Sequence, residues 1–153
     1  MILTTSSLVR VSLGLALIIL STYIKIFIGP IPLTLQTITF FSISYYLTSV
    51  EKNIIFLLFI SLGSLGLIHS ASNIHFLMSP TLGYLLGMFI GSFVISSIKN
   101  TYKAWFVYLL STYVFGLAYL NIFYSFHQAL MIGFYPFILP ELIKTIAVVS
   151  FKK

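Results

Sequence analysis

Two ionisable side chains near the C-terminus lie inside a long apolar stretch. Glu141 and Lys144 are three residues apart, and residues at this spacing share one face of a helix, so the two side chains can pair. Pro140 suits the first position of a helix, which places Glu141 in the first turn. An ionisable residue in a membrane segment is costly and indicates a functional site by default. Two interpretations stay open: a self-neutralising pair that holds this helix against its neighbours, or part of a ligand or ion site.

A second polar group follows a stiff Gly-Pro-Ile-Pro segment at residues 29–32. Thr34, Gln36 and Thr37 open the next apolar run with three hydrogen-bonding side chains. Gln36 offers two donors and an acceptor, which suits an amide or urea group. Threonines in membrane helices often bond backbone carbonyls one turn back, so a purely structural role for Thr34 and Thr37 stays equally open.

A third group opens a later apolar run. Gly83, Gly87 and Gly91 recur every four residues, which predicts a smooth helix face for close packing. Thr81 and Tyr84 lie among them and are the better candidates for contact with a ligand.

Other chemistry is excluded by residue type and spacing. The chain has no cysteine, the three histidines match no zinc pattern, and no phosphate-binding loop is present. No nucleophile and base can be paired either. We therefore expect no metal, no cofactor and no enzymatic activity, and ATP hydrolysis, if used, must come from another chain. The basic residues are not clustered, so we expect no nucleic-acid partner.

The composition predicts a protein embedded in lipid. Apolar residues make up 59% of the 153 residues, charged residues 7%, and the mean hydropathy is +1.12. Soluble domains carry roughly 25% charged residues. We expect an all-α, multi-pass membrane protein that forms a single transmembrane domain over residues 1–153. Breaks in the apolar pattern predict six transmembrane helices, at about 8–28, 33–50, 53–69, 80–98, 104–122 and a last one that ends near Phe151.

The distribution of basic residues predicts the orientation in the membrane. Cytoplasmic loops carry the excess of Lys and Arg. One side of the predicted bundle has only Lys25, whereas the other has Arg10, Lys52, Lys99, Lys103, Lys152 and Lys153. Both termini are therefore expected in the cytoplasm. At the same side, Ser12 and Ala16 give a small-xxx-small spacing, a docking face for another membrane subunit.

The three polar groups together resemble the BioY family of biotin transporters, the substrate-capture components of energy-coupling factor transporters. That family carries a G-P-x-P-x-T-L-Q-T stretch after its first helix, and residues 29–37 match every named position. Residues 79–87 are similar to its G-P-[TS]-G-G-Y-L-x-G stretch, and residues 135–144 to a P-x-[DE]-x-x-K-like stretch near its end. The resemblance covers nearly the whole chain, on the same six-helix plan.

The resemblance implies capture of biotin at the outer face of the bacterial cytoplasmic membrane. Its site residues would be Thr34, Gln36, Thr37, Asn73, Thr81, Gly83, Tyr84, Glu141 and Lys144. The resemblance further implies that the first helix, through Ser12 and Ala16, faces a transmembrane coupling subunit linked to ATPase subunits.

Several positions depart from the family pattern. Glu141 replaces the usual Asp, Ser79 replaces a glycine, and a short loop at residues 70–75 replaces a Gly-rich one. Two alternatives therefore stay open: a capture subunit for another vitamin, or a small accessory subunit of a membrane complex in which Glu141 and Lys144 transfer protons.

Overall fold

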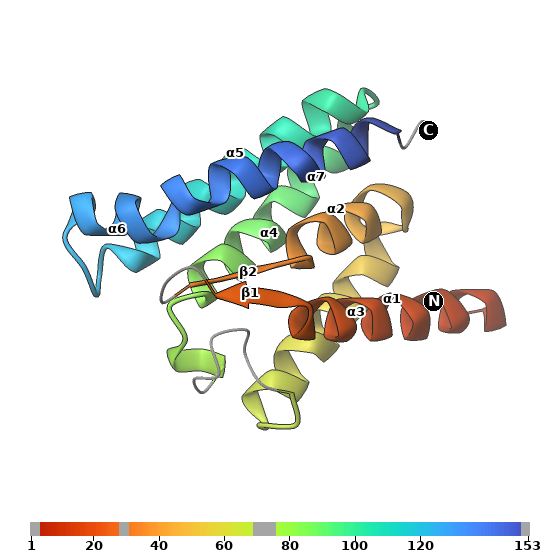
Figure 1. The fold of residues 1–153 in the computed structure, drawn as a ribbon. Helices are drawn as coiled ribbons and strands as arrows, with labels where there is room; N and C mark the ends of the chain where they lie inside the picture. The colour runs from red at the N-terminus through yellow and green to blue at the C-terminus, as the bar shows by residue number, and fades with distance from the viewer. Residues whose placement is uncertain (1–3, 28–30, 69–75, 151–153) are drawn as a thin grey trace.

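The chain folds into an all-α bundle with one short β-hairpin (Figure 1). The computed structural model describes residues 4–27, 31–68 and 76–150. The α-helices are α1 Thr5–Tyr23, α2 Gln36–Tyr46, α3 Ser49–Ser64, α4 Leu82–Val94, α5 Thr101–Leu120, α6 Phe126–Gly133 and α7 Ile138–Ser150. Strands β1 Lys25–Phe27 and β2 Pro32–Thr34 pair antiparallel, and the 3-10 turns are η1 Phe76–Met78, η2 Ile95–Ser97 and η3 Tyr135–Phe137.

Three helical segments are long and apolar enough to cross a membrane: Thr5–Tyr23, Thr101–Leu120 and Phe126–Val148. Helix α4 and turn η2 together form a shorter apolar helix, Leu82–Ser97. Large apolar side chains cover the outside of these segments, with Leu13 60% and Ile146 70% exposed. Water would not solvate such a surface, and a bilayer does. The fold is that of a multi-pass membrane protein.

The end of the first helix differs from the prediction. Helix α1 stops at Tyr23 rather than near residue 28, and β1 follows with Lys25 opposite Thr34 and Phe27 opposite Pro32. Ile24, Ile26 and Phe27 are β-branched or aromatic, which favours a strand once a partner strand is available. An apolar run by itself could not distinguish these two outcomes. The hairpin brings Thr34 back beside the end of α1.

Helix α3 also begins earlier than predicted. Residues 51–53 belong to the helix, where the sequence analysis placed a break. Thr48 and Glu51 form a capping box, in which the Thr48 hydroxyl accepts from the Glu51 N–H and the Glu51 carboxylate accepts from the Thr48 N–H. Thr48 and Glu51 have the sequence spacing of a capping box, so the earlier start of α3 could have been predicted from the sequence.

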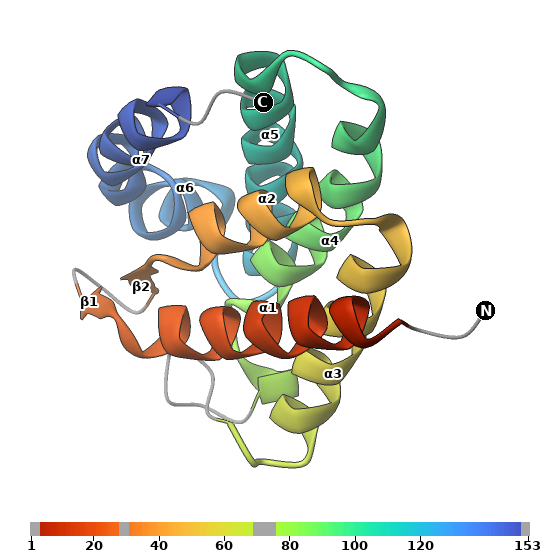
Figure 2. The same cartoon turned by 90° about the vertical axis from the view of Figure 1, so that its right-hand side faces the viewer.

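The last predicted span is one helical segment broken by turn η3. Pro136 lies in this turn and Pro140 at the third position of α7, rather than at the first as expected. Both views place the α6–α7 segment alongside α5 (Figures 1 and 2). The prolines account for the break, because a proline has no backbone N–H to donate within a helix. Phe137 of the turn lines a cavity.

The glycines of α4 form its contact with α5, as the sequence predicted. A Cβ added at Gly87 would meet backbone atoms of Ser111 and Thr112, and one at Gly91 would meet side-chain atoms of Tyr108 and Ser111. The Ser111 hydroxyl donates to the Gly87 carbonyl oxygen at 2.9 Å. The two helices therefore approach at backbone distance.

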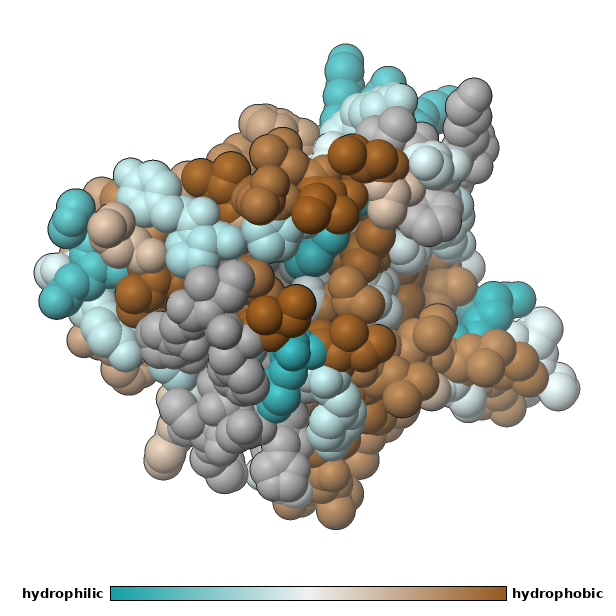
Figure 3. All heavy atoms as spheres, in the orientation of Figure 1, coloured by the Kyte–Doolittle hydropathy of each residue, from teal (hydrophilic) through white to brown (hydrophobic). Residues whose placement is uncertain are grey.

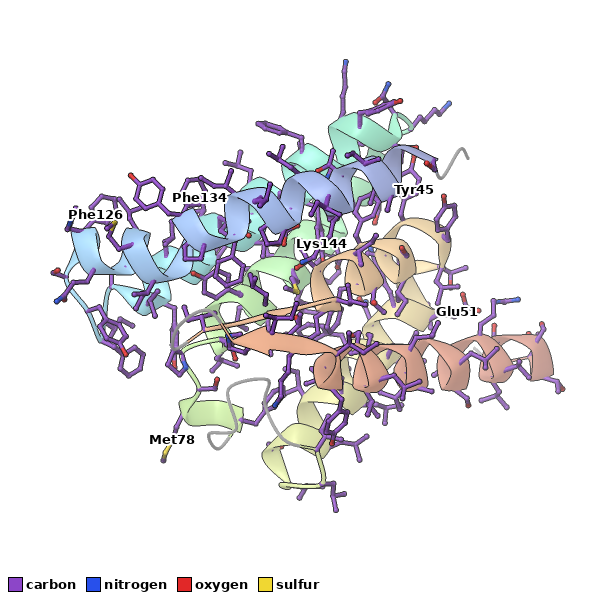
Figure 4. The ribbon with its side chains drawn as sticks, in the orientation of Figure 1. Tyr45, Glu51, Met78, Phe126, Phe134 and Lys144 are labelled. Carbon is purple, nitrogen blue, oxygen red and sulfur yellow. The ribbon has the colours of Figure 1, made fainter. Side chains whose placement is uncertain are left out.

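A polar cluster ties α1, α3 and α4 together at the end of the bundle where α1 begins. The Glu51 Oε1 atom accepts from Arg10 Nη2 at 2.6 Å and from Ser7 Oγ at 2.8 Å. The Lys52 ammonium donates to the Ser92 carbonyl oxygen. Glu51 is labelled beside α1 in Figure 4. These contacts hold together the three helices against which α2 packs.

We predict that Gly87→Ala lowers the stability of the protein in detergent by about 1–3 kcal/mol, the usual cost of overpacking. The new methyl group would meet backbone of α5, which cannot move without separating the helices. Gly91→Ala is the matched control, because its neighbours are side-chain atoms at 3.1–3.4 Å that can shift. Thermal unfolding in detergent measures both, and an equal effect of the two changes would contradict this explanation.

Candidate functional site

The Glu141–Lys144 pair is formed, as predicted. Both side chains lie on α7, and the Lys144 Nζ atom is 2.8 Å from Glu141 Oε1. Their residues are only 6% and 8% exposed. Figure 4 shows Lys144 in the interior, between α7 and the neighbouring helices α2 and α4. A buried ion pair of this kind needs further hydrogen bonds to offset the loss of hydration.

Thr37 of α2 supplies those hydrogen bonds. Its hydroxyl donates to Glu141 Oε1 and accepts from Lys144 Nζ, both at 3.3 Å. The Thr37 hydroxyl oxygen thus contacts two residues that lie more than a hundred positions away in the sequence. Of the two interpretations open for Thr37, bonding within its own helix is wrong, because its partners are on α7.

Gln36 forms hydrogen bonds with Thr22 at the end of α1 and with Thr34 of β2. Its Nε2 atom donates to the Thr22 hydroxyl at 2.9 Å, and its Oε1 atom accepts from the Thr34 hydroxyl at 3.3 Å. Thr34 Oγ1 also accepts from the Gln36 backbone N–H. Thr22 was missed by the sequence analysis, which treated the end of the first helix as part of an apolar span. It is buried and donates to the Ile18 carbonyl oxygen.

Tyr84 and Thr81 lie on the other wall of the site. The Tyr84 hydroxyl donates to the Gly133 carbonyl oxygen at 2.8 Å, where α6 ends. A side chain at Gly116 or Gly133 would collide with Tyr84, so both glycines make room for its ring. Thr81 forms a hydrogen bond with Ser79 at 2.6 Å.

A small cavity lies where these groups meet. Six of the nine candidate residues line it: Thr34, Gln36, Thr37, Thr81, Tyr84 and Lys144. Apolar side chains, among them Phe137 and Met88, complete the wall. Its volume of about 40 Å³ is enough for a few water molecules. The structure therefore brings together residues from β2, α2, α4 and α7 around one space.

The other three candidates are placed differently. Glu141 lies behind Lys144 and faces a groove between α5 and α7. Gly83 lies away from the cavity, because it packs on Phe115 and Tyr119 of α5. This position follows from the packing role of the α4 glycines. Asn73 falls outside the described residues.

The site has hydrogen-bonding capacity left over. A lysine ammonium has three N–H donors, and the bonds to Thr37 and Glu141 occupy two of those of Lys144. The Glu141 Oε2 atom is buried and has no hydrogen-bond partner in the described part of the chain. Lys144 lines the cavity, whereas Glu141 lines the groove between α5 and α7, so the free lysine donor is the one beside the cavity. Within the described ranges, no cluster of His, Asp or Glu could hold a metal ion.

The chain matches one known protein family over nearly its full length. The profile of the BioY family matches residues 1–152. The chain belongs to the BioY family. The match covers the hairpin, the cavity and the Glu141–Lys144 pair, so the resemblance seen in the three polar groups is confirmed over nearly the full length.

Individual BioY proteins are similar at moderate identity. The chain is 31% identical to "Biotin transporter BioY" of Thermotoga maritima over 150 residues, 91% of this chain and 89% of the relative. It is 31% identical to "Probable biotin transporter BioY" of Pyrococcus horikoshii, over 88% and 86% of the two chains. It is 33% identical to "Biotin transporter BioY2" of Lactococcus lactis subsp. cremoris, over 95% and 87%. No solved structure matches significantly.

We predict that Thr37→Val destabilises this BioY protein by about 1.5 kcal/mol or more, the usual worth of a hydrogen bond to a charged group. Valine keeps the shape of threonine but leaves the buried pair without its partner on α2. Thr39→Val on the same helix is the control, because Thr39 is only half-buried and donates to the Leu35 carbonyl oxygen of its own helix. Thermal unfolding in detergent measures the difference, and equal shifts for the two variants would refute the role of Thr37.

Proposed function

We propose that the protein binds biotin in the cavity beside Lys144 and takes part in its uptake across the bacterial cytoplasmic membrane. The curated relatives are named biotin transporters, and they are similar over about nine-tenths of the chain. The observation that carries the proposal is the buried Lys144 ammonium, which lines the cavity with one N–H donor unused.

The unused groups complement the ureido ring of biotin. A urea presents one carbonyl oxygen flanked by N–H groups, so it accepts from an ammonium and donates to an oxygen acceptor. Lys144 can donate its third N–H to the ureido oxygen, and the hydroxyl oxygens of Thr34 and Thr81 on the cavity wall can accept from the ureido N–H groups. The ion pair is already neutral as a unit. A neutral urea therefore adds no net charge to a buried site, whereas the biotin carboxylate would.

The cavity must widen to admit the vitamin. Sites for small molecules usually have a volume of about 300–1,000 Å³, well above the 40 Å³ of this cavity. The short elements on its wall are the β-hairpin and turn η3. Neither is held by the hydrogen bonds of a long helix, so these elements can separate at a lower cost than two packed helices. We propose that biotin enters between them.

The orientation proposed for the chain has both termini on the cytoplasmic side, with six membrane-crossing segments. The start of α1, the α2–α3 turn, the start of α5 and the end of α7 lie at the right of Figure 1. The basic residues Arg10, Lys52, Lys99 and Lys103 belong to these segments. This arrangement fits the excess of Lys and Arg on the cytoplasmic side. It places the hairpin and the cavity toward the outside.

A membrane partner can dock on α1. Ser12 and Ala16 are exposed on its outer face, flanked by the exposed Leu13 and Leu17. Small side chains one turn apart let another helix approach closely. We propose that this face meets a transmembrane coupling subunit, linked to ATPase subunits, as in energy-coupling factor transporters.

We predict that Lys144→Ala lowers the affinity for tritiated biotin by at least roughly 30-fold, because removing one member of a buried charge pair costs 2 kcal/mol or more in binding. Binding is measured with the purified protein in detergent. Lys99→Ala removes an exposed lysine outside the cavity and is expected to leave the affinity unchanged.

A second variant separates binding from folding. In Lys144→Met/Glu141→Gln neither charge remains, so no unpaired ion is buried. We expect this variant to fold and still to lose biotin binding. Wild-type affinity in either variant would overturn the proposed role of the pair.

A further inference from the structure

An apolar groove runs between α5 and the α6–α7 segment, outside the cavity. Its volume is about 660 Å³, and Tyr102, Trp105 and Leu110 line one side and Phe134, Leu142 and Thr145 the other. Figure 3 shows apolar side chains gathered over this part of the molecule, along the upper edge. In a multi-pass membrane protein such a groove faces the hydrocarbon.

The length of the groove matches one leaflet of a bilayer. Along α5 its lining runs from Tyr102 to Tyr113, and on the other side from Phe134 to Thr145. Each stretch corresponds to about 16 Å of helix at 1.5 Å per residue. The hydrocarbon core is about 30 Å thick, so one leaflet contributes about 15 Å. A transmembrane helix of a partner would extend far beyond this groove, whereas a lipid tail would not.

The charges at one end of the groove suit a phospholipid headgroup. Lys103 follows the groove residue Tyr102 at the start of α5, Lys99 lies just before it, and both lysines are exposed. Tyrosine and tryptophan favour the level of the headgroups, and Trp105 lies one turn deeper. Figure 3 shows hydrophilic side chains at this end, above the start of α5.

We propose that the groove binds one acyl chain of a phospholipid whose phosphate lies at Lys103 and Lys99. Glu141 lines the groove at 6% exposure, and Tyr113 and Phe137 line both the groove and the cavity. The bound acyl chain therefore covers the back of the buried ion pair. It also supports the wall that separates the cavity from the bilayer. This inference concerns a lipid site and does not depend on which vitamin the cavity holds.

The single tryptophan of the chain reports on the groove. Trp105 is 3% exposed and lines it. The protein is loaded with phosphatidylglycerol that carries bromine on its acyl chains, and then moved into lipid-free detergent to remove loosely associated lipid. We expect quenching of Trp105 fluorescence to persist, because the bromine atoms remain against the indole ring. Loss of all quenching after the exchange would overturn the proposal.

Matched variants test where the retained lipid lies. Leu110→Phe/Leu142→Phe adds bulk from both sides of the groove and is expected to reduce the retained quenching by at least half. Val114→Phe/Leu139→Phe changes exposed residues of the same helices outside the lining, and should retain it. Equal retention in the two double variants would contradict the proposed site.

Two further results complete the test. Lys103→Glu reverses an exposed charge without touching the groove and is expected to lower retention of phosphatidylglycerol. Native mass spectrometry of the wild-type protein should show one copy of the chain with one phospholipid. Two copies without lipid would instead mean that the groove is an interface between protein chains, and would refute lipid binding.

Discussion

The buried contact among Glu141, Lys144 and Thr37 constrains the rest of the structure. A lone charge in a low-dielectric interior costs several kcal/mol, so each member of the pair requires the other and both require an additional hydrogen bond. Two of the three groups lie on one helix at i and i+3, and the third comes from α2. The start of α2 must therefore lie against the middle of α7. The β-hairpin achieves this, because it turns the chain after α1 and delivers α2 at the required place.

The remainder of the bundle provides a rigid frame for this contact. Helices α4 and α5 approach at backbone distance through Gly87, and the Glu51 cluster fixes α1 to α3. Between this frame and α7 a small cavity remains, and the polar groups on its wall come from segments far apart in the sequence. A groove lined by apolar side chains lies on the opposite side of the pair. The ion pair thus lies between a cavity that has several polar side chains on its wall and a groove that is almost wholly apolar.

Local signals in the sequence predicted more of the structure than contacts between distant segments did. The i, i+3 spacing of Glu141 and Lys144 is a local signal, and the pairing that it predicted was confirmed. The strand at residues 25–27 was missed because its formation depends on pairing with β2, a contact that an apolar run does not reveal. Thr22 was missed for a similar reason, since its partner Gln36 is brought beside it only by the hairpin. By contrast, the capping box at Thr48 was present as a recognisable local pattern.

The most direct test of the central claim is competition against tritiated biotin on the purified protein. Biotin methyl ester keeps the ureido ring and lacks the carboxylate, whereas 2-iminobiotin replaces the ureido oxygen by a nitrogen and carries a positive charge at neutral pH. If Lys144 binds the ureido oxygen, the ester competes and 2-iminobiotin does not, because its cation would face the lysine ammonium. Competition by 2-iminobiotin but not by the ester would contradict this account and assign the pair to the carboxylate.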